Sequence, residues 1–309
     1  MGHRVKNIRS QAMSNITDIH ARFCQHSLAF KGNTPRTIYW FQTDFRMFLK
    51  YKPITELKEL TQEAIEDWIL YGKLERNWKA HTIRKRLQSM GIFLKWCVLQ
   101  GYITENPCDR IPLPRLPKQI PKHLTAEEAE NLMAWTRNFP FVYKFDKKRA
   151  IAILGTFLYT GIRKAELVNL KMEDVNLKER TLYVRDGKCM KDRMIPIHSK
   201  LMIYLEDYLK ERKRLNKCCP YFFTAMRQDS KMGDPVVKRL INKISKKSGI
   251  KFYPHLLRHT FATLMLEGGC NIYALSRMMG HSDIKTTTIY LAATKTHLES
   301  QIEKHSLMA

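Results

Sequence analysis

The sequence lacks several features that mark common classes of protein. It contains no run of about 18 apolar residues, the length that a membrane-spanning helix needs. The longest apolar segment, residues 150–162, is interrupted by Gly155, Thr156 and Thr160, so we interpret it as a buried helix. The basic N-terminus is followed by no apolar segment, so we do not expect a secretory signal.

Motifs for disulfides, metals and nucleotides are also absent. The seven cysteines are scattered, odd in number, and form no C-x-x-C motif, which argues against a disulfide scaffold or a zinc ribbon. Unpaired cysteines favour a reducing compartment, so we expect a cytoplasmic protein. The chain has no G-x-x-x-x-G-K-[ST] loop for nucleotide hydrolysis and no acidic cluster for two metal ions. We therefore expect neither a metal nor another cofactor.

Acidic residues are scarce in this chain. Lys and Arg total 54 and Asp and Glu total 29, which gives a formal net charge of +25. This excess predicts a polyanionic partner, and nucleic acid is favoured over an anionic membrane surface because the basic residues are not confined to one amphipathic helix. Residues 76–104 and 235–266 contain no acidic residue at all, so we expect basic faces there that bind phosphates, with merely solvated faces as the alternative. The candidate DNA-binding residues are Lys79, Arg84, Lys85, Arg86, Lys246 and Lys247.

The chain is expected to form two domains. Apolar periodicity and capping residues predict helices near residues 14–30, 35–52, 61–71 and 81–99. Five prolines between residues 107 and 121 prevent a helix and favour an extended linker. We therefore predict a helical domain at residues 1–106, a proline-rich linker at residues 107–121 and a second domain at residues 122–309.

The second domain is predicted to be mainly helical with a small antiparallel β-sheet. Two strand-like runs, TLYVRD and RMIPI, flank the segment GKCMKD, which is typical of a hairpin turn. A capping box at Thr125 and Glu128 predicts the start of the first helix. Further helices are expected at residues 200–215, 236–247, 254–267 and 272–279, and from about residue 286.

Polar residues in the second domain suit phosphate chemistry when they are taken together. Taken singly, each has an ordinary explanation as an ion pair, a solvated lysine, a packed histidine or a core tyrosine. Together, two arginines, a lysine and two histidines would form a cationic site for one phosphate, and a tyrosine would supply an oxygen nucleophile. The candidate residues are Arg163, Lys188, His255, Arg258, His281 and Tyr290, with Glu166 beside Arg163.

The histidine pair on the helix at residues 254–267 does not favour a metal. His255 and His259 are four residues apart, but the zincin pattern requires a glutamate where Leu256 stands. His255 falls near the N-terminus of this helix, where free N–H groups favour an anion. We interpret His259 as a structural residue.

The ordered motifs TGIRKAEL, GKCMKDR, HLLRHTFA and GHSDIKTTTIY resemble those of the tyrosine recombinases, the phage integrase family, and most resemble its Xer-type members. The resemblance implies a helical core-binding domain that binds DNA, followed by an α+β catalytic domain. It also implies an enzyme that cuts and rejoins DNA at a specific site without metal or ATP. The reaction would pass through a 3′-phosphotyrosyl intermediate and a Holliday junction.

The resemblance assigns a role to each candidate residue. Tyr290 would be the nucleophile, Lys188 the general acid, and His255 is our candidate for the base that deprotonates the tyrosine. Lys191 is a less favoured substitute for Lys188, because the family lysine directly follows the glycine. The residues that would stabilise charge on the phosphate are Arg163, Arg258 and His281, supported by Glu166.

The resemblance also implies partners. These are a double-stranded DNA recombination site, a homodimer on each site and a tetramer in the synaptic complex, coupled by docking of residues 296–309 on a neighbouring protomer. A second recombinase or an accessory protein stays open, as does the choice between chromosome-dimer resolution and mobile-element integration. A type IB topoisomerase-like enzyme and a DNA-binding regulator without catalysis are the alternatives. The size, the Xer-like motifs and the docking tail disfavour the topoisomerase-like enzyme, and the complete set of active-site residues disfavours the regulator.

Overall fold

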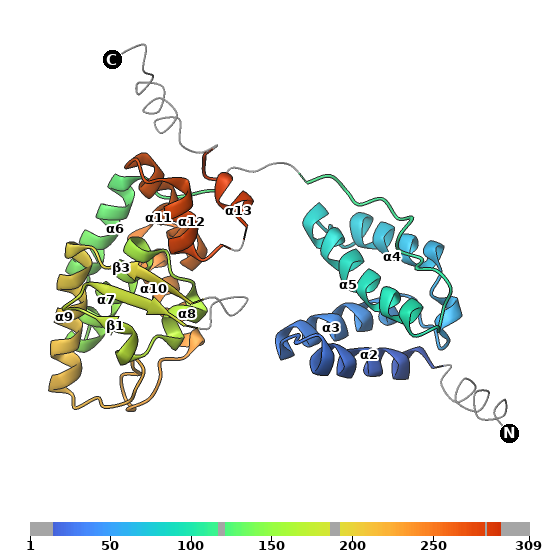
Figure 1. The fold of residues 1–309 in the computed structure, drawn as a ribbon, viewed down its shortest axis with the longest axis horizontal. Coiled ribbons are helices and arrows are strands. Elements are labelled where there is room, and N and C mark those ends of the chain that lie inside the picture. Colours follow the sequence, from blue (N-terminus) through green and yellow to red (C-terminus); the bar gives the residue numbers. More distant parts are fainter. Residues whose placement is uncertain (1–14, 117–120, 186–191, 282, 292–309) are drawn as a thin grey trace, which may run out of the picture. The chain divides into compact units, whose positions relative to one another are not determined.

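The computed structural model describes residues 15–116, 121–185, 192–281 and 283–291 (Figure 1). The chain divides into two compact units, residues 1–118 and residues 119–309. Within the described residues, no helix is long and apolar enough to cross a membrane. The same residues contain no group of three or more His, Cys, Asp or Glu side chains that could hold a metal ion.

The first unit is helical, as predicted. Its elements are α2 (Ile16–Phe30), α3 (Pro35–Tyr51), the short 3-10 helix η1 (Leu57–Glu59), α4 (Gln62–Leu74) and α5 (Ala80–Leu99). The predicted caps at Thr34 and Thr61 are confirmed, because each hydroxyl accepts a backbone N–H from the residue three positions on. Pro35 occupies the first turn of α3, where its missing N–H costs no hydrogen bond.

The core of the first unit is rich in aromatic side chains. The buried rings include Phe23, Phe41, Phe45, Phe48, Trp68 and Phe93. His20 lies among them with its ring stacked 3.9 Å from that of Phe45, and burial lowers the pKa of His20 to about 3. Leu28 is exposed, although it is apolar and lies on the same helix as the buried Phe23. It lies about 120° around the helix from Ile16, so Ser27 faces the core in its place.

The second unit has a small sheet among helices, which confirms the predicted fold class. Its elements are α6 (Ala126–Asn138), α7 (Lys144–Thr160), α8 (Lys164–Asn169), η2 (Met172–Asp174), β1 (Val175–Asn176), β2 (Thr181–Val184), β3 (Arg193–Pro196), α9 (Ser199–Arg214), α10 (Asp234–Ser248), α11 (Pro254–Glu267), α12 (Ile272–Met279) and α13 (Lys285–Thr288). The antiparallel strand order is β1-β2-β3, and Val184 pairs with Arg193. The predicted turn that contains Lys188 lies outside the described residues.

Helix α7 is the centre of this unit. It is buried on nearly every side and packs against α6, α9 and α11 (Figure 1). The helix ends at Gly161, whose φ of +59° belongs to the left-handed region that glycine favours. A Cβ atom at this position would lie 2.4 Å from the ring of Phe261 on α11. The close approach brings the turn between α7 and α8 directly against α11, where the candidate site forms.

Candidate active site

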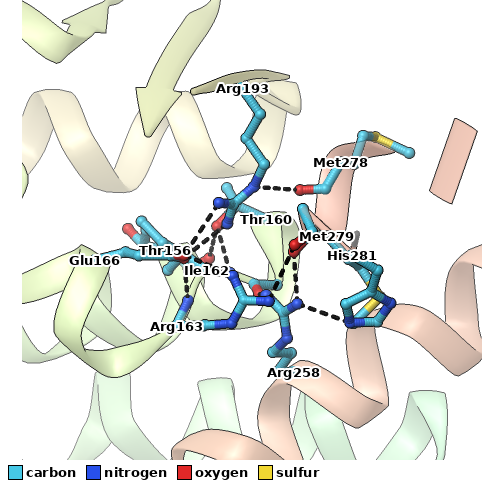
Figure 2. A network of polar contacts seen from close by, with 12 residues as sticks. Thr156, Thr160, Ile162, Arg163, Glu166, Arg193, Arg258, Met278, Met279 and His281 are labelled. Atoms are coloured by element: carbon cyan, nitrogen blue, oxygen red, sulfur yellow. Dashed lines mark hydrogen bonds and ion pairs between the residues drawn. The ribbon is translucent and has the colours of Figure 1, made fainter. Parts of the chain in front are cut away.

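Arg258 connects three separate segments of the second unit. Its guanidinium on α11 donates to the carbonyl oxygen of Gly161 at 2.5 Å and to that of Met279 at 2.6 Å (Figure 2). The same group contacts Nε2 of His281 at 3.1 Å. Burial, followed by the nearby charge of Arg163, lowers the pKa of Arg258 to about 9, so the guanidinium stays charged at neutral pH. A buried positive charge is therefore held where the end of α7 meets the end of α12.

Glu166 is the carboxylate of this cluster, and two arginines bind it. Arg163 precedes α8; its backbone N–H donates to Glu166 Oε2 and its Nη1 to Oε1, both at 2.8 Å. Arg193 on β3 donates to Oε1 at 3.0 Å and to Oε2 at 2.7 Å. Burial alone would raise the pKa of Glu166, but the hydrogen bonds and charge of Arg193, together with Arg163, lower it to about 2. The carboxylate is ionised and orients both arginines.

The three arginines and one carboxylate leave a surplus of positive charge. Arg163 also reaches the carbonyl oxygen of Gly280 at 3.2 Å, and Arg193 donates to that of Met278 at 2.7 Å (Figure 2). With Glu166 ionised and Arg258 charged, the cluster carries more guanidinium than carboxylate charge. Such a group of fixed donors can bind one phosphate.

His281 is held in one protonation state by its neighbours. An arginine can only donate hydrogen bonds, so the contact from Arg258 makes Nε2 of His281 the acceptor. The ring proton is then on Nδ1, which donates to the hydroxyl of Thr287 at 2.8 Å. Burial and then the charges of Arg258, Arg163 and Arg193 lower the pKa of His281 to about 4, which agrees with a neutral ring.

Tyr290 lies buried beside a histidine that the sequence interpretation left as structural. Only 2% of Tyr290 is exposed, and its side chain joins an apolar cluster with Phe261 and Leu275. Its hydroxyl is 2.8 Å from Nδ1 of His259 on α11. Burial raises the pKa of Tyr290, whereas the charges of Arg258 and Arg163 lower it. The phenol therefore lies within the electrostatic influence of the arginine cluster.

His255 lies at the edge of the same cluster. It is exposed in the first turn of α11, where the predicted position near the helix N-terminus is confirmed. Burial of part of its ring, and then the charges of Arg258, Arg163 and Lys164, lower its pKa. The structure thus brings together five of the six predicted catalytic residues, and Lys188 is outside the described part of the chain.

The sequence analysis did not assign His259 or Arg193 to the site, although both lie in motifs that it singled out. His259 directly follows Arg258, and Arg193 ends the motif GKCMKDR. Nothing in the local pattern shows that Tyr290 returns to His259 from 31 residues away, or that Arg193 pairs with Glu166 across 27 residues.

The predicted basic residues of the first unit differ in their surroundings. Lys79 and Lys85 are exposed, and Lys85 Nζ lies 3.5 Å from the centre of the Trp40 ring. Arg84 is partly buried and donates to the carbonyl oxygen of Pro114 at 3.1 Å. Arg86 does not lie on an open face with them.

The guanidinium of Arg86 packs 3.8 Å from the Trp78 ring and lies 3.8 Å from Asp44, and its side chain is only 13% exposed. The expectation that Arg86 lies on an exposed basic face is therefore wrong, because its guanidinium makes contacts inside the first unit. Lys246 and Lys247, in the last turn of α10 in the second unit, are exposed.

The chain is similar to known recombinases over nearly its whole length. Residues 122–297 match the model of the "Phage integrase family". Tyrosine recombinase XerA of Pyrococcus furiosus is 38% identical, and the match covers 99% of this chain and 97% of that protein. The structure of the Tn1549 transposon integrase with a circular intermediate DNA has a TM-score of 0.74 at 21% identity, covering 94% and 99% of the two chains. A lambda integrase dimer bound to a core site has a TM-score of 0.71 at 18% identity, covering 94% and 81%.

These similarities define the class of the protein as a tyrosine recombinase, an enzyme of DNA cleavage and rejoining. The chain belongs to the phage integrase family. The resemblance inferred from the four motifs is thereby confirmed.

Proposed function

We propose that Tyr290 attacks a scissile DNA phosphate that Arg163 and Arg258 hold in place. One observation carries this proposal: residues from α8, from α11 and from the segment that follows α12 meet in one polar network, and Tyr290, which follows α13, lies within reach of the charges of its arginines. Arg258 links this network to His281, and the charges of Arg258 and Arg163 act on the hydroxyl of Tyr290. A phosphate bound by the guanidinium groups would therefore lie near the tyrosine.

The proposed reaction conserves bond energy in a covalent intermediate. The oxygen of Tyr290 forms a bond to phosphorus, and the bond to the 5′ oxygen breaks, which leaves a 3′-phosphotyrosyl link and a 5′-hydroxyl. Lys188, whose role rests on the family resemblance, supplies a proton to the leaving oxygen. A 5′-hydroxyl of the partner strand then attacks the link, so rejoining needs no ATP. Two rounds of exchange through a Holliday junction complete site-specific recombination.

Arg163 and Arg258 would stabilise the negative charge that develops on the phosphate oxygens. The family resemblance gives His281 the same task, which requires a proton on Nε2; without DNA, Nε2 instead accepts the hydrogen bond from Arg258 and so helps to hold that arginine. Donors fixed before the reaction are effective because no reorganisation is needed at the transition state. Glu166 holds Arg163 by two hydrogen bonds and so supplies this preorganisation. Removal of one such donor costs a factor of about 10² to 10³ in rate.

The proposed partner is a double-stranded recombination site. The Tn1549 integrase and the lambda integrase were each solved with DNA, the latter as a dimer, which supports a dimer of this chain on each site. Exposed Lys79, Lys85, Lys246 and Lys247 would supply phosphate contacts. We further propose a tetramer in the synaptic complex, docking through residues 296–309, action in the cytoplasm, and no cofactor.

Trapping the covalent intermediate tests the proposed function. Wild type and Tyr290→Phe are incubated with nicked suicide substrates made from the DNA that flanks the gene and from Xer-type sites. A denaturing gel is expected to show protein–DNA adducts with wild type alone, while both proteins bind the DNA equally. Adducts that persist in Tyr290→Phe would assign the nucleophile to another residue, and tight binding without any adduct would favour a regulator.

A further inference from the structure

The geometry points to His259 as the catalytic base that takes the proton of Tyr290 during strand cleavage. This inference rests on the proposed role of Tyr290 as nucleophile. It replaces the expectation that His255 is the base, and it gives a chemical role to a residue that sequence patterns alone present as structural.

The contact between the two side chains meets the geometric requirement for proton transfer. Nδ1 of His259 lies 2.8 Å from the hydroxyl oxygen of Tyr290, inside the range of about 2.6–3.2 Å that a general base needs. The ring centres are 5.6 Å apart. His259 is in the middle of α11 next to Arg258, so one helix presents both a phosphate ligand and a proton acceptor.

The protonation state of His259 agrees with this role. The titratable and charged groups that face it are His255 and Arg258 on α11, His123 on the segment before α6, and Tyr290 after α13. Burial lowers the pKa of His259, and the charges of His255, Arg258 and His123 lower it further. The ring is therefore neutral near pH 7. With its proton on Nε2, it offers the lone pair of Nδ1 to the phenol.

The tyrosine needs such an acceptor. A free phenol has a pKa of about 10, and burial raises the pKa of Tyr290. Transfer to a histidine of lower pKa is unfavourable before DNA binds, so the nucleophile stays protonated in the free enzyme. A bound phosphate brings the proton transfer into the same step as nucleophilic attack, where a positioned base contributes about 10² to 10⁴ in rate.

One cycle of cleavage and rejoining returns Tyr290, His259 and Lys188 to their starting protonation states. In cleavage, the O–H bond of Tyr290 breaks and the proton moves to Nδ1 of His259, while the phenolic oxygen bonds to phosphorus and the 5′ oxygen leaves with a proton from Lys188. In rejoining, a 5′-hydroxyl attacks, gives its proton to Lys188, and the bond between phosphorus and Tyr290 breaks. The imidazolium of His259 then returns its proton to the tyrosine.

The environment of His255 suits another task. It is exposed in the first turn of α11, where backbone N–H groups and Arg258 attract an anion. We therefore assign His255 to the phosphate and His259 to the nucleophile. The two histidines on one helix provide a matched pair for experiment.

Single-turnover cleavage of a nicked suicide substrate, followed as a function of pH, tests the assignment. In His259→Asn, the amide oxygen can lie near the place of Nδ1 and accept the same hydrogen bond, but it does not titrate. The wild-type cleavage rate is expected to rise with pH as His259 loses its proton, with a midpoint below the usual histidine pKa of 6.5; this rise is the acid limb of the profile. His259→Asn is expected to lose this limb and about 10²-fold or more in rate, with unchanged DNA affinity. His255→Asn should keep the limb.

Two results would overturn the assignment. If His259→Asn keeps the wild-type rate and pH profile, His259 only positions Tyr290 and is not the base. If the acid limb is lost in His255→Asn but not in His259→Asn, His255 is the base. If His259→Asn melts early, His259→Ala with imidazole in the buffer replaces it, and no rate recovery would reject the base role. Tyr290→Phe separates the two hypotheses: adducts in that variant reject the proposed nucleophile whatever His259 does.

Discussion

Arg193 and Glu166 form a bidentate ion pair that joins β3 to α8. The two guanidinium nitrogens lie 3.0 and 2.7 Å from the two carboxylate oxygens, and both side chains are only 7% exposed. The third nitrogen of the guanidinium donates to the carbonyl of Met278 at 2.7 Å. Arg193 therefore connects the strand that follows the lysine-bearing segment to the end of the helix that precedes His281.

This ion pair predicts how stability depends on pH. The pKa of Glu166 is lowered from 4.5 to about 2, so its contribution is fully present above pH 4.5 and is lost as the pH falls toward 2. Glu166→Gln should lower the free energy of unfolding at pH 7 by about 3 kcal/mol, and should flatten the pH dependence between these limits. Urea denaturation at a series of pH values measures both effects. Parallel curves for wild type and variant would contradict the prediction.

Thr287 is expected to orient His281 through its hydroxyl. Thr287→Val keeps the shape of the side chain but removes the acceptor of the Nδ1 proton, so the ring loses one of its two fixed contacts. The cleavage rate at saturating DNA should fall about 10-fold, in keeping with the loss of one hydrogen bond of about 1.4 kcal/mol, while DNA affinity stays constant. Thr287→Ser, which keeps the hydroxyl, is the control. Equal rates for the valine and serine variants would show that the hydroxyl is unimportant.

Gly161 and Gly249 offer a matched test of crowding at the site. Both have positive φ values, +59° and +76°, so alanine is strained at either position. A Cβ at Gly161 meets the ring of Phe261, whereas nothing lies within 4 Å of one at Gly249. Gly249→Ala should cost about 1 kcal/mol, and Gly161→Ala about 2–4 kcal/mol with a loss of cleavage, because the carbonyl that Arg258 uses would shift. Thermal melting curves that shift equally would refute the role of crowding.

Lys85 and Arg86 are neighbours in sequence with different expected functions. Lys85→Gln should reduce the salt dependence of DNA binding by about one unit of slope and lower stability by no more than about 1 kcal/mol, because the exposed residue loses its contact with the Trp40 ring. Arg86→Gln should lower the melting temperature, because its guanidinium packs on Trp78 beside Asp44. DNA titrations at several salt concentrations, with melting curves, separate the two. An unchanged melting temperature in Arg86→Gln would contradict this assignment.

Local features of the sequence were sufficient for most of the helices and for the family. The N-caps Thr34, Thr61 and Thr125 begin helices where expected, since a cap involves only residues within one turn. Helix α11 spans residues 254–267, as predicted from its proline and its periodicity. The four ordered motifs identified the phage integrase family because each preserves a short spacing of chemical groups.

Contacts between distant segments were decided only by the tertiary structure. Arg193 meets Glu166, and His259 meets Tyr290, because the side chain of Arg193 reaches from β3 to α8 and because the chain returns to α11 after α13. Arg86 faces Trp78 and Asp44 rather than solvent, although its place in a basic segment resembles that of Lys85. Charge and periodicity describe what a residue can do within a turn or two of chain. Which distant partner it meets depends on how whole elements pack, and that packing selects the proton acceptor of Tyr290.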